Sequence, residues 1–369
     1  MNFQEDKRVV MTLDAGGTNF VFNGVQGGNE LFEPHRLKAR ADTLEEELEK
    51  IIEGFGDIRS ALDEAPAAIS FCFPGPADYQ AGIIGDLENL PVFRGGVPLK
   101  AMLEDKFGIP VFINNDGDLF TFGEAIGGLL PEINSKLEAN GNPRRYRHLF
   151  GATFGTGFGG GIVYDGRLFI GDNSAGGEVN RIRNKLYPHT SAEDSTSIRA
   201  IRRVYAREAQ ISFDDSPNPK EIQEMGLGLR EGNQAAAMKA WEEMAIAAGD
   251  ALANAVTLVD SCIVIGGGLA GAYQLFLQKL VDEMNETFHG IDGRSLPRME
   301  ITALNLENPS ELAIMLENTS REVPVPFSNR TVTWHPSRYI GVGISRLGTS
   351  KAVSVGAYAF ALAQLDRTK

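Results

Sequence analysis

Two aspartates of this chain, Asp14 and Asp116, each follow a short apolar run that is typical of a buried strand. After Asp14 come two glycines, a threonine and Asn19, and a second strand-like run begins at Phe20. Glycines in such a turn let backbone N–H groups approach a ligand closely. Asp14 supplies a carboxylate where a hydrated Mg²⁺ would sit. The segment therefore predicts a hairpin whose turn cradles a phosphate group.

Asp116 stands in a polar cluster that follows the apolar run from Ile109 to Ile113 and reads Asn-Asn-Asp-Gly-Asp. Polar groups at the carboxyl end of a buried strand are where ligands bind in open α/β sheets. A carboxylate there has the chemistry to take a proton from a substrate hydroxyl that attacks a phosphoryl group. The alternative is that an aspartate only caps the following helix, with asparagine in the turn.

The glycine turn recurs in residues 150–163, where five glycines lie between Gly155 and Gly161. Glycine weakens the interior of a strand, so we expect these glycines to serve a ligand rather than core packing. Two strand–turn–strand units predict a duplicated fold with two phosphate-binding hairpins facing one cleft. A third turn, Gly266–Gly268, separates a buried strand from a helical pattern and suits the adenosine of a nucleotide. None of the turns has the spacing of a P-loop or of a dinucleotide-binding fingerprint.

In order along the chain, the motifs are LDAGGTN, FPGPAD, INNDGD, GTGFGGGIV and IVIGGGLA. Together they resemble the ROK sugar kinases (repressor, open reading frame, kinase) of the sugar-kinase/Hsp70/actin superfamily. The resemblance covers nearly the whole chain. It implies an α/β protein with a two-domain actin-like ATPase fold, built from duplicated ribonuclease H-like domains around a cleft. It also implies ATP- and Mg²⁺-dependent phosphorylation of a hexose or N-acetylhexosamine, as in glucokinases, fructokinases or N-acetylmannosamine kinases.

The resemblance also implies roles for single residues, with Asp116 as the general base and Asp14 near Mg²⁺. The residues implied to hold ATP and its phosphates are Asp14, Gly16, Gly17, Thr18, Asn19, Gly155, Thr156, Gly157, Gly266, Gly267 and Gly268. Those implied to contact the sugar are Gly75, Asn89, Asn115, Asp116, Glu178 and Glu193.

The sequence departs from the family pattern after Gly177. Family members carry Gly-Glu-x-Gly-His and then a cysteine cluster that binds structural zinc. Here Arg181 replaces the histidine, and residues 184–197 contain no cysteine. We therefore expect no zinc site, and we expect hydrogen bonds and packing to hold this loop. Glu178 has an equally simple explanation as a hinge residue in a glycine-rich turn.

A length of 369 residues predicts two domains. We expect residues 1–118 and 352–369 to form the smaller one and residues 119–351 the larger. Residues 306–337 are rich in Pro, Asn, Ser and Thr and predict an insertion with a short strand near residues 330–334. Elsewhere, helices are expected after Thr43, which begins a capping box with Glu46, from residue 235 to 259, and from residue 355 to 365.

The apolar side of the second of these helices is expected to serve as core or as a subunit contact and to carry Met238, Trp241, Met244, Ala245, Ala248 and Leu252. A net charge of −14 argues against a nucleic-acid partner. No apolar run approaches the length of a membrane span, and the N-terminus lacks the apolar core of a signal peptide. The two cysteines, Cys72 and Cys262, lie in apolar runs that suit a reducing compartment. We therefore expect a cytoplasmic protein, and the resemblance implies a homodimer.

A second class of function stays open. A non-catalytic sugar-sensing protein that retains the kinase fold would account for the missing histidine and cysteines. Asp116 and the two glycine hairpins favour catalysis instead, because a protein that only binds sugar needs no base.

Overall fold

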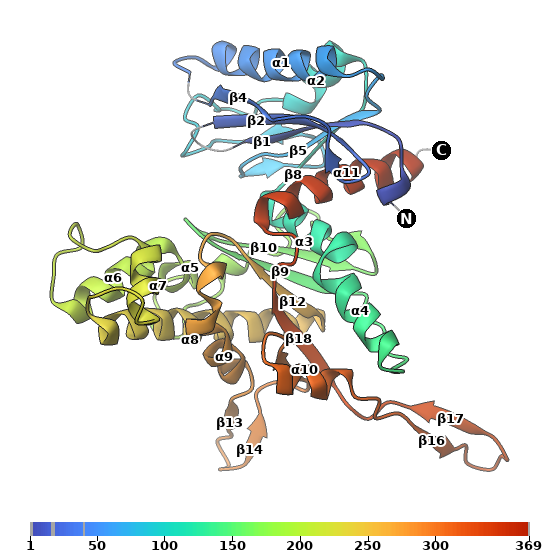
Figure 1. Cartoon of the computed structure of the whole chain (residues 1–369), viewed down its shortest axis with the longest axis vertical. Coiled ribbons are helices and arrows are strands. Elements are labelled where there is room, and N and C mark those ends of the chain that lie inside the picture. The colour runs from blue at the N-terminus through green and yellow to red at the C-terminus, as the bar shows by residue number, and fades with distance from the viewer. Residues whose placement is uncertain (1–2, 16–18, 40, 368–369) are drawn as a thin grey trace. The chain divides into compact units, whose positions relative to one another are not determined.

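A computed structural model describes residues 3–15, 19–39 and 41–367. The described chain divides into two compact units, each built of helices and strands (Figure 1). The first unit comprises residues 1–127, 167–176 and 347–369, and the second comprises residues 128–166 and 177–346. The sequence predicted domain boundaries between residues 118 and 119 and between residues 351 and 352. These boundaries concern domains that fold independently, and they remain a prediction.

The first unit is a mixed sheet with helices on both faces. Its main strands are β1 (Val10–Ala15), β2 (Asn19–Gln26), β3 (Asn29–Glu30), β4 (His35–Lys38), β5 (Ala68–Cys72) and β8 (Val111–Asn114). The sheet order is β3-β2-β1-β5-β8, with β4 on β2. Strand β1 pairs antiparallel with β2 and parallel with β5, and β5 pairs parallel with β8. The first predicted hairpin is thus confirmed.

Helices α1 (Leu44–Ala61), α2 (Leu99–Phe107) and α11 (Thr349–Arg367) cover this sheet, and α3 (Asp116–Gly127) packs on α11. Helices α1 and α2 share one apolar core with the sheet, while α11 packs on the opposite face through Val355 and Tyr358. The predicted cap of α1 forms only in part. The Glu46 N–H donates to Oγ1 of Thr43 at 3.2 Å, but the Glu46 carboxylate accepts from the Asp42 N–H.

The second unit is built on a sheet in the order β10-β9-β12-β18-β15. These strands are β9 (Leu149–Phe154), β10 (Phe158–Tyr164), β12 (Cys262–Gly266), β15 (Thr302–Asn305) and β18 (Tyr339–Ile344). Its helices are α4 (Leu129–Ala139), α5 (Glu193–Thr196), α6 (Ile198–Ala209), α7 (Pro219–Gly226), α8 (Gln234–Val259), α9 (Tyr273–Met284) and α10 (Pro309–Leu316). Strands β9 and β10 form the second predicted hairpin.

Helix α8 runs through the core of the second unit. Trp241 and Leu252 are buried as predicted, and the Trp241 ring stacks on Phe276 of α9 at 6.1 Å. Met238 is 43% exposed, so it does not share the core with the other residues of the predicted apolar side, and a subunit contact there remains a prediction. The period of a helix identifies its apolar face but not how far neighbouring elements cover that face. In the described ranges, none of the helices combines the length and apolar character that crossing a membrane requires.

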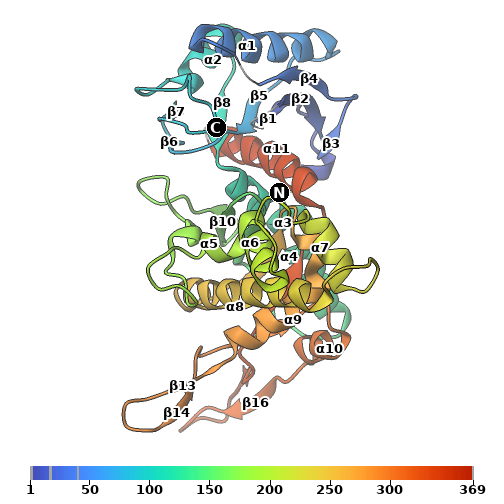
Figure 2. The same ribbon diagram turned by 90° about the vertical axis from the view of Figure 1, so that its left-hand side faces the viewer.

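Two-stranded ribbons extend from the second unit (Figures 1 and 2). One joins β13 (Thr287–His289) to β14 (Ser295–Pro297), and the other joins β16 (Arg321–Pro324) to β17 (Thr331–Trp334). The predicted strand near residues 330–334 is therefore β17, although the sequence did not predict its partner or helix α10. The short elements that remain are η1 (Phe3–Glu5), β6 (Ala77–Asp78), β7 (Ile83–Ile84), β11 (Arg167–Leu168), η2 (Val179–Arg181) and η3 (Ala270–Ala272).

Candidate active site

Asp14 and Asp116 lie at the same edge of the first unit's sheet. Asp14 is in register with Cys72 of β5, and Cys72 is in register with Asn114 of β8. Asp116 follows two residues later and begins α3. Parallel strands end at one edge of a sheet, and this edge is where open α/β sheets bind ligands. The fold thus brings together two of the predicted site residues that are far apart in the sequence.

The environment favours the protonated form of both carboxyl groups. Burial raises the pKa of Asp116, while hydrogen bonding, including the Gly117 N–H that donates to Oδ1 at 2.8 Å, lowers it. The pKa of Asp14 is also raised, first by burial and then by the negative charge of Asp116, whereas Arg36 lowers it. Both side chains keep a solvent-exposed surface, so a ligand can reach them. A carboxylate with an increased proton affinity is suited to accept a proton.

Asn115 is fixed at both ends of its amide. Its Oδ1 accepts from the Gly117 N–H at 2.8 Å, and its Nδ2 donates to the hydroxyl of Tyr79 at 3.4 Å. The Tyr79 hydroxyl in turn donates to the carbonyl oxygen of Phe73 at 3.0 Å, and Tyr79 is buried. Tyr79, which orients the side chain beside Asp116, was not predicted from the sequence.

The other residues predicted for the first unit have varied settings. Asn19 begins β2 with an exposed side chain, and Asn89 is exposed in the loop between β7 and α2. Gly75 lies against Tyr79, because a Cβ atom at residue 75 would come within 2.9 Å of the Tyr79 hydroxyl. Gly16, Gly17 and Thr18 lie outside the described residues.

In the second unit, Gly155, Thr156 and Gly157 form the turn between β9 and β10. The Gly155 N–H donates to the Gly157 carbonyl oxygen at 2.9 Å, and Thr156 is exposed. The next N–H, of Phe158, donates to Oε2 of Glu193 at 3.0 Å. Glu193, predicted from the resemblance as a sugar contact, therefore also holds the predicted phosphate turn.

The third turn, Gly266–Gly268, lies beside the second. The N–H of Leu269 donates to the carbonyl oxygen of Phe154 at 3.0 Å, and a Cβ on Gly155 would have the Gly268 nitrogen 4.0 Å away. Gly267 has a φ of +87°, and a Cβ there would meet the Phe154 carbonyl oxygen at 2.2 Å. Glycine is thus required at residue 267, while Gly268 borders open space. The structure brings two predicted nucleotide-binding turns together.

The glycines within β10 have a different cause from the one predicted. A Cβ on Gly160 would meet the carbonyl oxygen of Gly177 at 2.3 Å, and one on Gly159 would meet Oγ1 of Thr153 at 2.5 Å. The prediction that the whole glycine run serves a ligand is therefore wrong for these two positions, where glycine permits close packing. Only the first part of the run lies in the turn.

The loop that follows Glu178 is organised by a buried asparagine. Nδ2 of Asn184 donates to the Ser191 carbonyl at 3.1 Å and to Oγ of Ser195 at 2.8 Å. Its Oδ1 accepts from the N–H groups of Leu186 and Tyr187, at 3.0 and 3.3 Å. Glu178, which precedes η2, and Arg181, its last residue, are both exposed. Among residues 3–15, 19–39 and 41–367, no group of three or more His, Cys, Asp or Glu side chains is placed to hold a metal ion.

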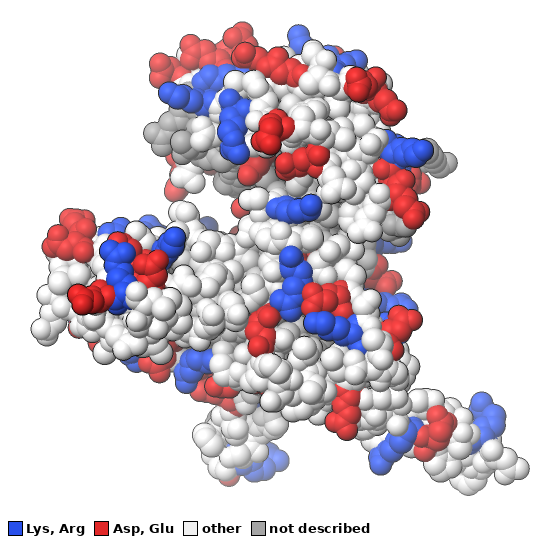
Figure 3. Space-filling view, in the orientation of Figure 1, with Lys and Arg blue, Asp and Glu red and all other residues white. Residues whose placement is uncertain are grey.

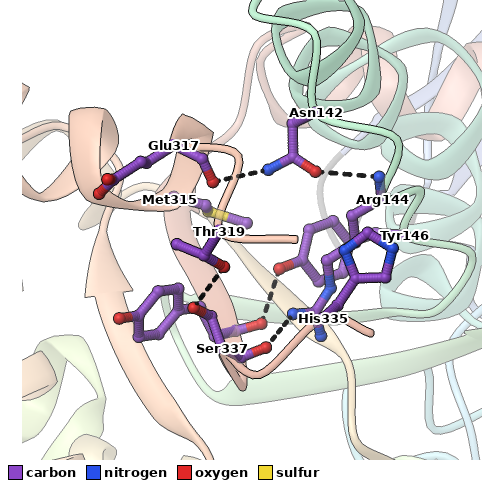
Figure 4. Close-up of a pocket in the computed structure, with 9 residues that line it drawn as sticks. Asn142, Arg144, Tyr146, Met315, Glu317, Thr319, His335 and Ser337 are labelled. Atoms are coloured by element: carbon purple, nitrogen blue, oxygen red, sulfur yellow. Dashed lines mark hydrogen bonds between the residues drawn. The ribbon is translucent and has the colours of Figure 1, made fainter. Parts of the chain in front are cut away.

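A small pocket lies elsewhere in the second unit, where residues 142–146 meet residues 315–339 (Figure 4). Arg144 donates to the Ser337 carbonyl and the Tyr146 hydroxyl to the Tyr339 carbonyl, both at 2.7 Å. The pocket contains none of the predicted site residues, and its hydrogen bonds attach the base of the β16–β17 segment. On the face shown in Figure 3, acidic and basic side chains are interspersed.

Known proteins resemble this chain over most of its length. A model of the ROK family matches residues 10–308. The crystal structure of a glucokinase from Parabacteroides distasonis is 52% identical, with a TM-score of 0.91 over 98% of this chain and 99% of that chain. A glucokinase from Thermotoga maritima is 26% identical over 313 residues, which cover 77% of this chain and 90% of the relative. An N-acetyl-D-glucosamine kinase from Vibrio cholerae is 31% identical over 171 residues, 46% of this chain and about half (51%) of that protein.

Proposed function

This chain belongs to the ROK family and has its two-domain actin-like fold, and from that premise we propose that it transfers a phosphoryl group from ATP to a hydroxyl of a hexose or N-acetylhexosamine. The observation that carries the proposal is Asp116, a solvent-accessible carboxylate with a raised pKa at the ligand-binding edge of the sheet. A protein that only binds sugar has no need of such a base. The family match and the nearly full-length likeness to a glucokinase support the same reaction.

In this mechanism Asp116 accepts the proton of the attacking sugar hydroxyl as the new oxygen–phosphorus bond forms and ADP leaves. Asn115 is held by Tyr79 and presents a fixed amide beside the base. Glu178 and Glu193 would accept hydrogen bonds from other sugar hydroxyls, while Gly75 and Asn89 complete the sugar site. Much of the rate enhancement then comes from positioning, as is usual for phosphoryl transfer.

The glycine turns fit a nucleotide. Gly155–Gly157 and Gly266–Gly268 lie side by side, and Gly268 borders open space that backbone N–H groups can share with a ligand. Asp14, near Asp116 and raised in pKa by it, fits a cation because a positive charge would relieve their repulsion. We propose that Asp14 holds Mg²⁺ through water, and that the ion would neutralise phosphate charge.

The sugar class is proposed from the relatives. The sugars named for these relatives, glucose and N-acetyl-D-glucosamine, have the same ring configuration and differ in the substituent at C2. Glucose is therefore the first substrate to test, followed by N-acetylglucosamine, mannose, fructose and N-acetylmannosamine. A coupled assay of ADP formation, with the phosphorylated sugar identified by mass spectrometry, tests the proposal. ATP hydrolysis that no sugar stimulates would contradict it.

A sugar-sensing protein is the alternative to be separated from the kinase. It would show sugar-induced thermal stabilisation without any phosphorylated product. We also propose that the protein works in the cytoplasm as a homodimer, which follows from the family resemblance and the two buried free cysteines. Light scattering of the purified protein measures the mass and would reveal a monomer directly.

A further inference from the structure

One segment, residues 193–198, holds the turn between β9 and β10 from both ends. Oε2 of Glu193 accepts from the Phe158 N–H at 3.0 Å, at the end of the turn. At its start, the Gly155 carbonyl accepts from the N–H of Ile198 at 2.8 Å. Gly157 lies between these bonds, and a Cβ there would come within 2.6 Å of Oε2. The position of the Glu193 carboxylate and the shape of the turn are therefore linked.

The segment that carries Glu193 is itself well anchored. Oγ1 of Thr196 donates to the Ala192 carbonyl at 3.0 Å, and Oγ of Ser195 accepts from Nδ2 of Asn184 at 2.8 Å. Glu193 is only half-buried, and none of the residues that the structure describes donates a hydrogen bond to its second oxygen, Oε1. One carboxylate oxygen thus holds the turn, and the other is available to a ligand.

We propose that Glu193 couples sugar binding to nucleotide binding. The proposal rests on the sugar kinase function. It gives Glu193 a second role beside its sugar contact, because the same carboxylate connects the bound sugar to the turn between β9 and β10. A sugar hydroxyl that donates to Oε1 immobilises the carboxylate, and Oε2 then fixes the Phe158 N–H and the turn that holds the phosphates. Nucleotide that binds to an already ordered turn loses less conformational entropy, so sugar increases the affinity for nucleotide.

Isothermal titration with Mg²⁺ and the non-hydrolysable analogue AMP-PNP measures this coupling, with and without saturating amounts of the best sugar substrate. We expect sugar to lower the Kd of AMP-PNP by about fivefold or more, within the range of coupling between sites in proteins. Linkage requires AMP-PNP to lower the Kd of the sugar by the same factor. The reverse titration is therefore an internal check on the measurement.

Three variants separate this connecting role from a simple sugar contact. In Glu193→Ala both functions of the carboxylate are lost, and the coupling factor should fall to about one. Glu193→Gln keeps an acceptor for the Phe158 N–H and should restore most of the coupling. Glu178→Ala is the matched control, because no hydrogen bond among the described residues joins the exposed side chain of Glu178 to the turn. It should weaken sugar binding but leave the coupling factor unchanged once sugar is saturating.

A fourth variant keeps the carboxylate. In Gly157→Ala the new methyl group displaces Oε2 from the Phe158 N–H, so coupling should be lost although Glu193 is still present. Coupling of wild-type strength in both Glu193→Ala and Gly157→Ala would overturn the proposal, as would a wild-type enzyme that phosphorylates sugar without any coupling. A wild-type protein that binds no sugar would instead overturn the kinase function itself.

Discussion

The charge of Asp116 adds to burial in raising the pKa of Asp14, although β5 separates β1, which carries Asp14, from β8, which ends two residues before Asp116. Because the native pKa of each carboxyl group lies above its ordinary value, each group favours the folded state only when protonated. That contribution is complete below the pKa of an unfolded aspartate, about 3.9, and is lost as the pH rises through the native value. At neutral pH the pair therefore costs stability, which is what a preorganised site for a proton and a cation requires.

Asp116→Asn should separate activity from stability. Asn keeps the oxygen that accepts from Gly117 but cannot take a proton, so we expect turnover to fall by ~10²–10⁴-fold. The variant should also unfold at an equal or higher temperature than the wild type at pH 7, because it removes a negative charge that the folded state disfavours, as the raised pKa of Asp116 indicates. Calorimetry at pH 7 and near pH 4 should show this advantage shrinking in acid.

The matched control for this variant is Asp105→Asn, on the exposed surface of α2. It should change neither turnover nor the melting temperature measurably. Turnover of Asp116→Asn within a few-fold of the wild type would rule out Asp116 as the base.

The pH dependence of kcat/KM should report the raised pKa of Asp116. Protonation of the base stops proton transfer, so kcat/KM should fall on the acid side with a midpoint above the ordinary aspartate value of about 3.9. A profile measured from pH 4 to 9 checks this, with the residual activity of Asp116→Asn as the control for ionisation of ATP. An acid limb that persists unchanged in that variant would assign the midpoint to another group.

Much of the fold follows from the sequence because its signals are local. Short apolar runs that flank a Gly/Thr turn predict the β1–β2 and β9–β10 hairpins, and a long 3.6-residue period predicts α8. The ribbon β16–β17 shows where this reasoning ends. Its strands are exposed and carry no alternation of buried and exposed positions, so the sequence indicated only one of them.

The position of a candidate site residue was predictable where it depends on neighbours in the chain and not where it depends on contacts across the fold. The sequence predicted that Asp116 follows a buried strand, and it does, whereas its role as the base remains a proposal. Tyr79 forms a hydrogen bond with Asn115, which is distant in the sequence, and Asn184 forms its hydrogen bonds within an irregular loop. The local sequence around either residue does not predict this role. Gly160 was assigned to ligand binding from its local sequence, but glycine is needed there because the backbone of Gly177, from another segment, packs against it.

Tyr79→Phe should affect sugar binding more than the chemical step. The change removes only the hydroxyl, so Nδ2 of Asn115 loses its acceptor and the Phe73 carbonyl loses its donor. We expect KM for the sugar to rise by several-fold with a smaller change in kcat, and the free energy of unfolding to fall by about 1 kcal/mol.

Tyr146→Phe is a matched control, since it removes a hydroxyl that donates to the Tyr339 carbonyl at 2.7 Å in the pocket of Figure 4. A similar loss of stability without any change in KM is expected. If both variants change KM equally, Tyr79 has no special part in positioning Asn115.

We expect Asn184 to order the loop from residue 184 to 197, where the family resemblance implies a zinc site that this sequence lacks. Its side chain takes part in four hydrogen bonds with this loop and is buried. Asn184→Ala should lower the free energy of unfolding by about 1–3 kcal/mol, since buried donors and acceptors are left without partners. Because Glu193 lies in the same segment, sugar affinity should fall as well. Denaturant unfolding and sugar titration measure the two effects.

The hydrogen bonds of Asn184 also predict how the protein responds to the removal of metals. A zinc-selective chelator should leave the melting temperature and turnover unchanged, since hydrogen bonds rather than thiolates hold the loop. EDTA should abolish turnover through loss of Mg²⁺, and added Mg²⁺ should restore it without zinc. Asp14→Asn should raise the Mg²⁺ concentration needed for half-maximal turnover, whereas Asn184→Ala should not. Stoichiometric zinc in the purified protein, lost together with activity on chelation, would show that a metal and not Asn184 orders this loop.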